Sequence, residues 1–340
     1  MAPFGNQTHS DLITGFPNSN KSWLALLIFI NSLAFFGNAT MITGILTTKR
    51  FRNPSHYFLV SLCMSDLLCS VLVMPFGIET AVSGTWENGE ATCYFWLIVD
   101  MMCCSSSVLN LALISLDKYL SIINPLRYAE FQTPRNALLM IAFVWLESMI
   151  TASVPLFGFW QMKNHSEVHV CVFSWFFPPK YYIFVLSVNL LLPFVAMLYV
   201  YGRIYVTARR QLHRISILFV TQNQSNMATK IIKQNKASRK LGMLLGVFVI
   251  CWSPYLTLTF YLQFCTLCRI HPFVVDIVTW LAWSNSSYNP ILYSWFNREY
   301  RQMYWRMFGC ANRNQIRLAT SGARTERNAN TVNASAVDAR

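Results

Sequence analysis

PFVVDIVTWLAWSNSSYNPILYSW, residues 272–295, is the segment that most strongly indicates the fold of this 340-residue chain. It is long enough to cross a bilayer, because about 20 mostly apolar residues suffice. Its inner half nevertheless carries amides, hydroxyls and a proline, which are costly in hydrocarbon unless other helices or water satisfy them. We therefore expect this segment to be a membrane helix that faces a bundle of other helices.

The composition places most of the chain in a membrane. Apolar residues make up 54% of it and charged residues only 12%, whereas a soluble domain carries about 25% charged residues. The apolar residues come in blocks, so we predict an all-α protein, a seven-transmembrane helix bundle that forms one domain over residues 23–296. The expected spans are 23–46, 57–82, 92–121, 137–158, 181–206, 240–263 and 272–295.

The distribution of charge predicts how these spans are oriented. The net charge of +13 alone could suggest a nucleic-acid partner. With the amino terminus outside, however, all but four of the 27 Lys and Arg residues fall on the cytoplasmic side. This asymmetry follows the positive-inside rule and suits the acidic lipids of the inner leaflet. We therefore expect a multi-pass plasma-membrane protein with membrane lipids, and no nucleic acid, as partners.

The amino-terminal tail is expected to be extracellular and glycosylated. Residues 1–22 are polar and lack the apolar core of a signal peptide, so the first span would serve as an uncleaved anchor. Asn6 and Asn20 open glycosylation sequons in this tail, and Asn164 opens another in an outer loop.

Four cysteines are predicted to face the outside, where disulfides persist. Cys93 opens the third span and Cys171 lies in the loop before the fifth, and both are disulfide candidates. Cys265 and Cys268 form a CxxC pair in the last outer loop. That pair is either a local bridge or two free thiols, and both alternatives stay open here.

The segment after the last span is predicted to contain a short amphipathic eighth helix, residues 297–310. Cys310 follows its basic stretch and is a palmitoylation candidate. Residues 311–340 are polar and are expected to form a disordered cytoplasmic tail.

Motifs in the predicted spans, taken in order, resemble those of rhodopsin-like (class A) G-protein-coupled receptors. They are Gly37-Asn38, Ser65-Asp66-Leu67, Asp117-Lys118-Tyr119, Trp145, Pro193 with Tyr201, Cys251-Trp252-Ser253-Pro254, and Asn289-Pro290-x-x-Tyr293. Within this family the chain looks most similar to the biogenic-amine branch and, inside it, to histamine type-2 receptors. The segments that carry this likeness are Leu109-Asn110-Leu111, Asn124-Pro125-Leu126-Arg127-Tyr128 and Asn289-Pro290-Ile291-Leu292-Tyr293.

Asp100 is the candidate counter-ion for a ligand. It precedes Asp117 by 17 residues, which is about 25 Å along one helix, so it lies near the outer face if Asp117 is at the cytoplasmic face. An unpaired carboxylate is costly there, and no Lys or Arg of the neighbouring spans is placed to pair it. The resemblance implies that Asp100 binds a protonated amine. The alternative is an Asp bonded to waters and hydroxyls in a pocket with another use.

Aromatic residues from the sixth and seventh spans are expected to surround this carboxylate, where they would attract a cation. The packing of Trp and Tyr in membrane helices is the alternative. Trp283 and Leu256 replace a usual tyrosine and a usual aromatic, so the usual hydroxyl bond to the aspartate is expected to be lost. The resemblance implies a pocket lined by Asp100, Met101, Cys104, Phe173, Val185, Asn189, Trp252, Tyr255, Leu256, Trp280 and Trp283.

The fifth span departs from the histamine pattern. Val185 and Asn189 stand where histamine type-2 receptors place an Asp and a Thr, so an imidazole would meet only Asn189. We expect a less polar amine, such as an aromatic monoamine without ring hydroxyls, or no amine agonist at all.

Below the pocket, Asp66, Ser107, Asn285, Ser286 and Asn289 match the buried sodium site of the family. Hard oxygen ligands around one carboxylate suit a small cation, so an allosteric sodium ion is expected, with a water-filled polar network as the alternative. The residues expected to form the conformational switch are Asp117, Lys118, Tyr119, Tyr201, Pro254, Pro290 and Tyr293, because the two prolines kink their helices.

Lys118 replaces the arginine that usually follows Asp117. Lysine lacks the planar fork of arginine, and Lys233 and Gln234 stand where many relatives keep an acidic partner. The sequence therefore predicts a weak inactive-state lock and altered basal signalling. Basal output would be raised if loss of the lock dominates, or lowered if Lys118 engages the G protein poorly.

These observations predict a receptor for a small amine that signals through a heterotrimeric G protein, of the stimulatory class if the histamine type-2 likeness holds, with arrestin as a further partner. The alternative within the fold is an orphan or peptide receptor in which Asp100 is structural. A transporter is disfavoured because the sequence has no two-fold internal similarity. An enzyme is disfavoured because no nucleophile–base pair stands out.

Overall fold

The computed structural model describes residues 21–157, 171, 173, 177–218, 225–264, 270 and 272–308, and every regular element within them is a helix. The predicted glycosylation sites Asn6, Asn20 and Asn164, the Cys265–Cys268 pair, Cys310 and the tail after it lie outside the described residues. So do the side chains of residues 211–241, which include Lys233 and Gln234.

The described helices agree with the predicted spans. Six spans are long and apolar enough to cross a membrane, and α11, with 25 residues, is long enough to be the seventh. The helices are α1 (Lys21–Thr47), α2 (Ser55–Leu72), α3 (Met74–Ser83), α4 (Gly89–Ile123), α5 (Pro125–Phe131), α6 (Pro134–Ser153), α8 (Pro179–Val185), α9 (Leu192–Leu218), α10 (Ser225–Phe264), α11 (Pro272–Phe296) and α12 (Arg298–Met307). Three short helical turns, Lys49–Phe51, Val154–Phe157 and Leu186–Leu191, complete the set.

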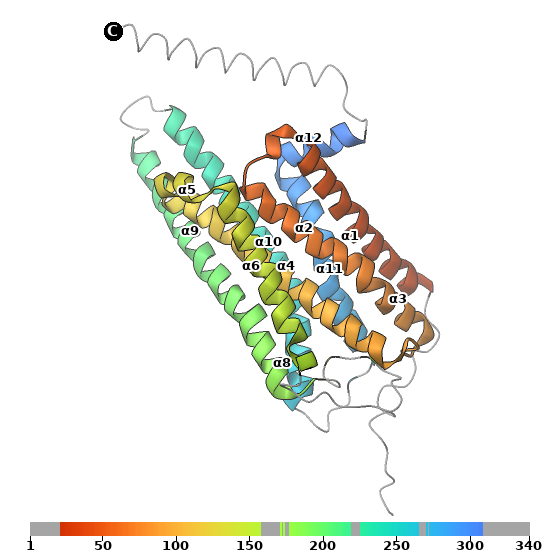
Figure 1. Cartoon of the computed structure of the whole chain (residues 1–340). Coiled ribbons are helices and arrows are strands. Elements are labelled where there is room, and N and C mark those ends of the chain that lie inside the picture. Colours follow the sequence, from red (N-terminus) through yellow and green to blue (C-terminus); the bar gives the residue numbers. More distant parts are fainter. Residues whose placement is uncertain are drawn as a thin grey trace, which may run out of the picture. The chain divides into compact units, whose positions relative to one another are not determined.

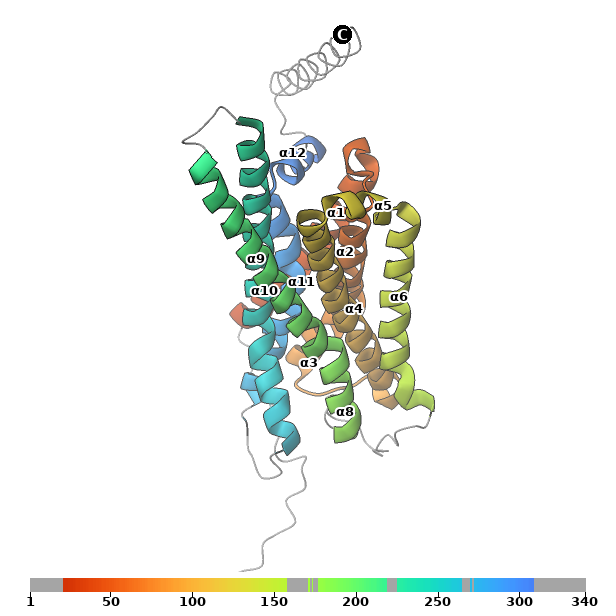
Figure 2. The ribbon, with the colours of Figure 1, turned by 90° about the vertical axis from the view of Figure 1, so that its left-hand side faces the viewer.

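The chain divides into two compact units, Met1–Leu292 and Tyr293–Arg340. In the first unit the long helices run alongside one another, with α5 at one end and α3 and α8 at the other (Figures 1 and 2). In the second unit the Asn297 side chain caps α12 by accepting a hydrogen bond from the Glu299 amide at 3.1 Å.

The bundle buries polar side chains within an apolar core and exposes large apolar side chains on its surface. Asn38, Asp66 and Asn110 are fully buried, whereas large apolar side chains such as Phe36 and Phe143 are about two-thirds exposed, at 66% and 67%. This is the pattern of a protein whose outer surface meets lipid, because polar groups in hydrocarbon must find partners within the bundle.

The second span breaks between α2 and α3. Pro75, at the second position of α3, cannot donate a backbone hydrogen bond, and the chain bends at Val73. The indole of Trp96 on α4 donates to the Val73 carbonyl oxygen at 3.0 Å. This bond holds the start of α3 against α4, next to the candidate site.

The fifth span contains one wide helical turn that the sequence did not predict. Leu186–Leu191 forms a π-helix between α8 and α9, in which the Leu192 amide bonds to the Ser187 carbonyl. Pro193 follows and lacks an amide hydrogen, so the ordinary ladder cannot continue through it. Such turns occur often at functional sites, and this one contains Asn189.

The outer end of the bundle is cross-linked. Cys93, at the start of α4, forms a disulfide with Cys171, and their Cα atoms are 5.8 Å apart. This is the disulfide that the sequence predicted for these two cysteines.

Candidate functional site

A cavity of about 90 Å³ opens among α4, α10, α11 and the fifth span. Ten of the eleven residues that the sequence assigned to the pocket line it, from Asp100 on α4 to Trp283 on α11. Trp280 does not line the cavity; it packs behind Trp283 with ring centroids 5.1 Å apart. The six lining residues that the sequence missed are Ser105, Val108, Tyr182, Leu186, Leu190 and Ala282.

Two of the missed residues follow from helical spacing. Ser105 stands four positions after Met101 on α4, and Val108 stands four positions after Cys104, so each shares a face with a residue already assigned to the pocket. Continuing the helical periodicity from those two residues would have found both. Leu186 and Leu190 could not be found in this way, because the π-turn shifts the face that the fifth span presents to the cavity.

Asp100 has two neighbours on one carboxylate oxygen. The Trp283 indole N–H donates to its Oδ1 at 3.0 Å, and the Cys104 thiol donates to the same atom at 3.5 Å. Among the described side chains, no Lys or Arg pairs with Asp100. The carboxylate therefore has neutral donors and no counter-charge.

The bond from Trp283 adds to one expectation. Replacement of the usual tyrosine was expected to remove the hydroxyl bond to the aspartate. The hydroxyl bond is indeed absent, but the indole N–H of Trp283 donates in its place. Sequence reasoning missed this because the reach of an indole depends on how closely α11 approaches α3 and α4.

Asn189 is held by two other helices. Its Nδ2 donates to Ser105 Oγ on α4 at 2.9 Å and to Thr151 Oγ1 on α6 at 2.8 Å. Thr151 donates its own hydrogen to the Glu147 carbonyl oxygen at 2.8 Å, so it can only accept from Asn189. This fixes the orientation of the amide. Its Oδ1 is buried and has no hydrogen-bond partner among the described residues.

A second polar cluster lies deeper in the bundle, around the fully buried carboxylate of Asp66. The Ser107 and Ser286 hydroxyls donate to its Oδ1 at 3.2 and 2.9 Å, and the Asn289 amide donates to its Oδ2 at 2.7 Å. Asn285, which the sequence also assigned to this cluster, is buried on α11 beside Ser286 but makes no hydrogen bond to Asp66. A carboxylate with hydroxyl oxygens beside it and no cationic partner among the described side chains fits a monovalent cation.

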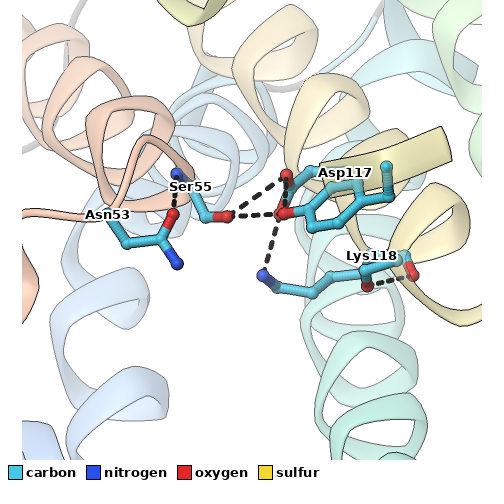
Figure 3. A network of polar contacts seen from close by, with 6 residues as sticks. Asn53, Ser55, Asp117 and Lys118 are labelled. Atoms are coloured by element: carbon cyan, nitrogen blue, oxygen red, sulfur yellow. Dashed lines mark hydrogen bonds and ion pairs between the residues drawn. The ribbon is translucent and has the colours of Figure 1, made fainter. Parts of the chain in front are cut away.

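The predicted cytoplasmic end of α4 carries a third cluster. The buried Asp117 accepts from the Tyr128 hydroxyl at 2.8 Å and from Ser55 Oγ at 3.3 Å, and Lys118 Nζ lies 2.8 Å from its other oxygen. Figure 3 shows Ser55 and Lys118 both pointing toward the Asp117 carboxylate. Burial, together with the charge of Asp117, raises the pKa of Tyr128 to about 12, so its hydroxyl remains a donor at neutral pH.

Other predicted switch residues lie where helices approach closely. A Cβ on Gly242 of α10 would overlap the Tyr201 ring. A Cβ on Gly37 of α1 would come within 3.0 Å of Pro290. Trp252 lines the cavity and stacks on Phe248 with ring centroids 5.9 Å apart. Its neighbour Pro254 lies inside α10, whereas Tyr119 packs beside Ile122 and Ile204.

The fold, the outer cavity and the polar clusters beneath it define a class of protein. Residues 37–293 match the family described as 7 transmembrane receptor (rhodopsin family), so the chain belongs to that family. It is a receptor and not an enzyme, and a multi-pass protein of the plasma membrane, as the sequence predicted.

Individual relatives narrow the comparison. The chain is 32% identical over 334 residues to 5-hydroxytryptamine receptor 1D of Rattus norvegicus. This match covers 84% of this chain and 88% of that protein. The chain is 30% identical over 339 residues to 5-hydroxytryptamine receptor 1B of Cricetulus griseus, covering 85% and 87%. These matches support the aminergic branch that the motifs predicted. They do not single out the histamine type-2 receptor.

Proposed function

We propose that the outer cavity binds a small protonated aromatic amine, with Asp100 as the counter-ion. The observation that carries this proposal is a carboxylate in an aromatic-lined cavity that accepts only from neutral donors. A cationic ligand would supply the missing charge, and the faces of Trp252 and Tyr255 would add cation–π attraction. The similarity to receptors named for 5-hydroxytryptamine, itself an aromatic monoamine, supports the same ligand class.

The far end of the cavity favours a ligand ring that carries a hydroxyl. Among the described residues, Asn189 Oδ1 is an acceptor without a partner, and Ser105 Oγ accepts from Asn189 while its own hydrogen has no acceptor there. A ring hydroxyl could donate to the first and accept from the second. The sequence led us to expect a ring without hydroxyls, because it identified Asn189 but not Ser105 beside it on α4.

The test is a panel of phenethylamine, tyramine, tryptamine, 5-hydroxytryptamine and histamine on cells that express the receptor, with cyclic AMP measured in both directions. We expect one of the aromatic amines to act potently and Asp100→Asn to weaken it at least about 30-fold, because truncating one partner of a desolvated charge pair costs about 2–5 kcal/mol. Asp276→Asn, which removes a carboxylate of α11 that does not line the cavity, should leave potency unchanged.

A response that Asp100→Asn leaves intact would contradict the amine assignment. High basal output without any amine response would favour the orphan or peptide receptor instead. The same measurement tests coupling to the stimulatory G protein, which the histamine likeness implied. A fall in forskolin-raised cyclic AMP would instead indicate coupling to an inhibitory G protein.

We also propose that the Asp66 cluster binds sodium as an allosteric ion. Asp66, Ser107 and Ser286 would supply oxygen ligands, Asn289 would orient the carboxylate, and the ion would supply the positive charge that the cluster lacks. Replacing sodium by choline in the binding assay should then change agonist affinity. Asp66→Asn should abolish that difference, whereas equal sensitivity in both receptors would exclude this ion site.

A further inference from the structure

We propose that Gly77 of α3 is a positioning residue for the ligand site, although it does not line the cavity. Gly77 is buried directly beneath the Trp283 indole. A Cβ at this position would lie 2.5 Å from Cζ3 and 2.9 Å from Cη2 of Trp283, and 3.4 Å from Cζ2 of Trp280. Since carbon atoms in contact are about 3.5–4.0 Å apart, the indole can occupy its place only because residue 77 has no side chain.

The indole of Trp283 is held by two neighbouring indoles and by its bond to Asp100. Trp283 is 5% exposed and is packed edge-to-face against Trp280 and against Trp96, with ring centroids 5.1 and 6.0 Å apart. It also lines the cavity, and its N–H donates to Asp100 at 3.0 Å. A methyl group at position 77 would therefore displace the closely packed Trp283 indole, whose N–H orients the Asp100 carboxylate.

The backbone of α3 is also unable to yield easily. The Trp96 indole donates to the Val73 carbonyl oxygen at 3.0 Å, and the Gly77 amide bonds to the same oxygen at 3.3 Å. Trp96 in turn packs against Trp86, with ring centroids 5.3 Å apart. The start of α3 is thus fixed to α4, the helix that carries Asp100. The positions of Gly77 on α3, Trp283 on α11 and Asp100 on α4 are therefore coupled through direct contacts.

This inference rests on the proposed amine function for its effect on binding. With Trp283 in place, Asp100 Oδ1 is occupied and the carboxylate has one orientation. With Trp283 displaced, the carboxylate can rotate and take other donors, so a bound ammonium meets a less ordered partner. We expect Gly77→Ala to weaken agonist binding about tenfold, since coupled neighbours in contact shift binding by roughly this amount.

The test is a double-mutant cycle of the unsubstituted receptor, Gly77→Ala, Trp283→Tyr and the double variant. Tyrosine lacks the outer ring atoms that Gly77 accommodates, and its hydroxyl can still donate to a carboxylate. Trp283→Phe fills similar space without a donor. Gly246→Ala of α10, where a Cβ meets nothing within 4 Å, is the matched control. Agonist affinity, with 5-hydroxytryptamine or the most potent amine of the panel as the probe, and the melting temperature of the ligand-free receptor are measured for each.

We expect Gly77→Ala to lower both affinity and melting temperature in the Trp283 receptor and to have little effect in the Trp283→Tyr receptor. Trp283→Phe should bind agonist more weakly than Trp283→Tyr at a similar melting temperature, because these two variants differ only in the hydroxyl donor. Equal effects of Gly77→Ala in both backgrounds would overturn the proposal. If no amine binds the unsubstituted receptor, the proposed function is wrong, and the positioning role stands or falls on the cycle in melting temperature alone.

Discussion

At the scale of single residues, the chemistry of Asp100 depends on which atoms donate to it. An ammonium partner within the protein would neutralise the carboxylate and compete with a cationic ligand. The indole of Trp283 instead donates to the carboxylate at 3.0 Å, and no cation among the described side chains compensates its charge. A neutral donor thus prepares the site for a cation, because desolvated charge strengthens its attraction to an incoming opposite charge.

Asn189 carries the prediction that belongs to this scale. If its Oδ1 accepts from a ring hydroxyl, 5-hydroxytryptamine should bind more tightly than tryptamine, and tyramine more tightly than phenethylamine. Asn189→Leu should remove about a fivefold advantage, because one neutral hydrogen bond contributes about 1 kcal/mol. Each pair of ligands differs by the hydroxyl alone, so comparison within a pair controls for any general loss of binding. An advantage that persists in Asn189→Leu would place the hydroxyl elsewhere in the cavity.

At the scale of elements, α4 connects all three polar sites. Its 35 residues carry Asp100 at the cavity, Ser107 at the Asp66 cluster and Asp117 at the far end. One continuous helix therefore contributes residues to the proposed ligand site, the proposed ion site and the predicted coupling face. The neighbouring α10 and α11 each contain an internal proline, Pro254 and Pro290.

The far end of α4 carries the prediction of this scale. Lys118 pairs with Asp117 through one oxygen, and its side chain is 41% exposed. Arginine could form two parallel hydrogen bonds with the same carboxylate. We expect Lys118→Arg to strengthen this pairing and to lower basal signalling by up to about fivefold, since partly exposed ion pairs contribute about 1 kcal/mol or less. Basal output per surface receptor is the measurement. An unchanged value would contradict the altered lock.

At the scale of the whole molecule, the disulfide closes a long stretch of chain. Cys93 and Cys171 are separated by 78 residues, and the bond ties α4 to the segment that precedes the fifth span. We expect the Cys93→Ser/Cys171→Ser variant to lose about 2–5 kcal/mol of stability, seen as a lower melting temperature and reduced surface expression. A reductant should lower the melting temperature of the unsubstituted receptor and leave the variant unchanged. Equal sensitivity to reductant in both would show that another bond is responsible.

The sequence by itself determined the class of the fold and the depth of its main sites. Hydropathy and charge along the chain predicted the spans and their orientation. The number of residues between Asp100 and Asp117 predicted that the two lie toward opposite ends of one helix. The tertiary structure alone decided which side chains meet. The indole bond of Trp283 to Asp100, the cleared space at Gly77 and the fixed amide of Asn189 each depend on the distance and rotation between helices far apart in sequence. Those quantities arise from packing, in which a single methyl group changes what fits, and no pattern within one segment encodes them.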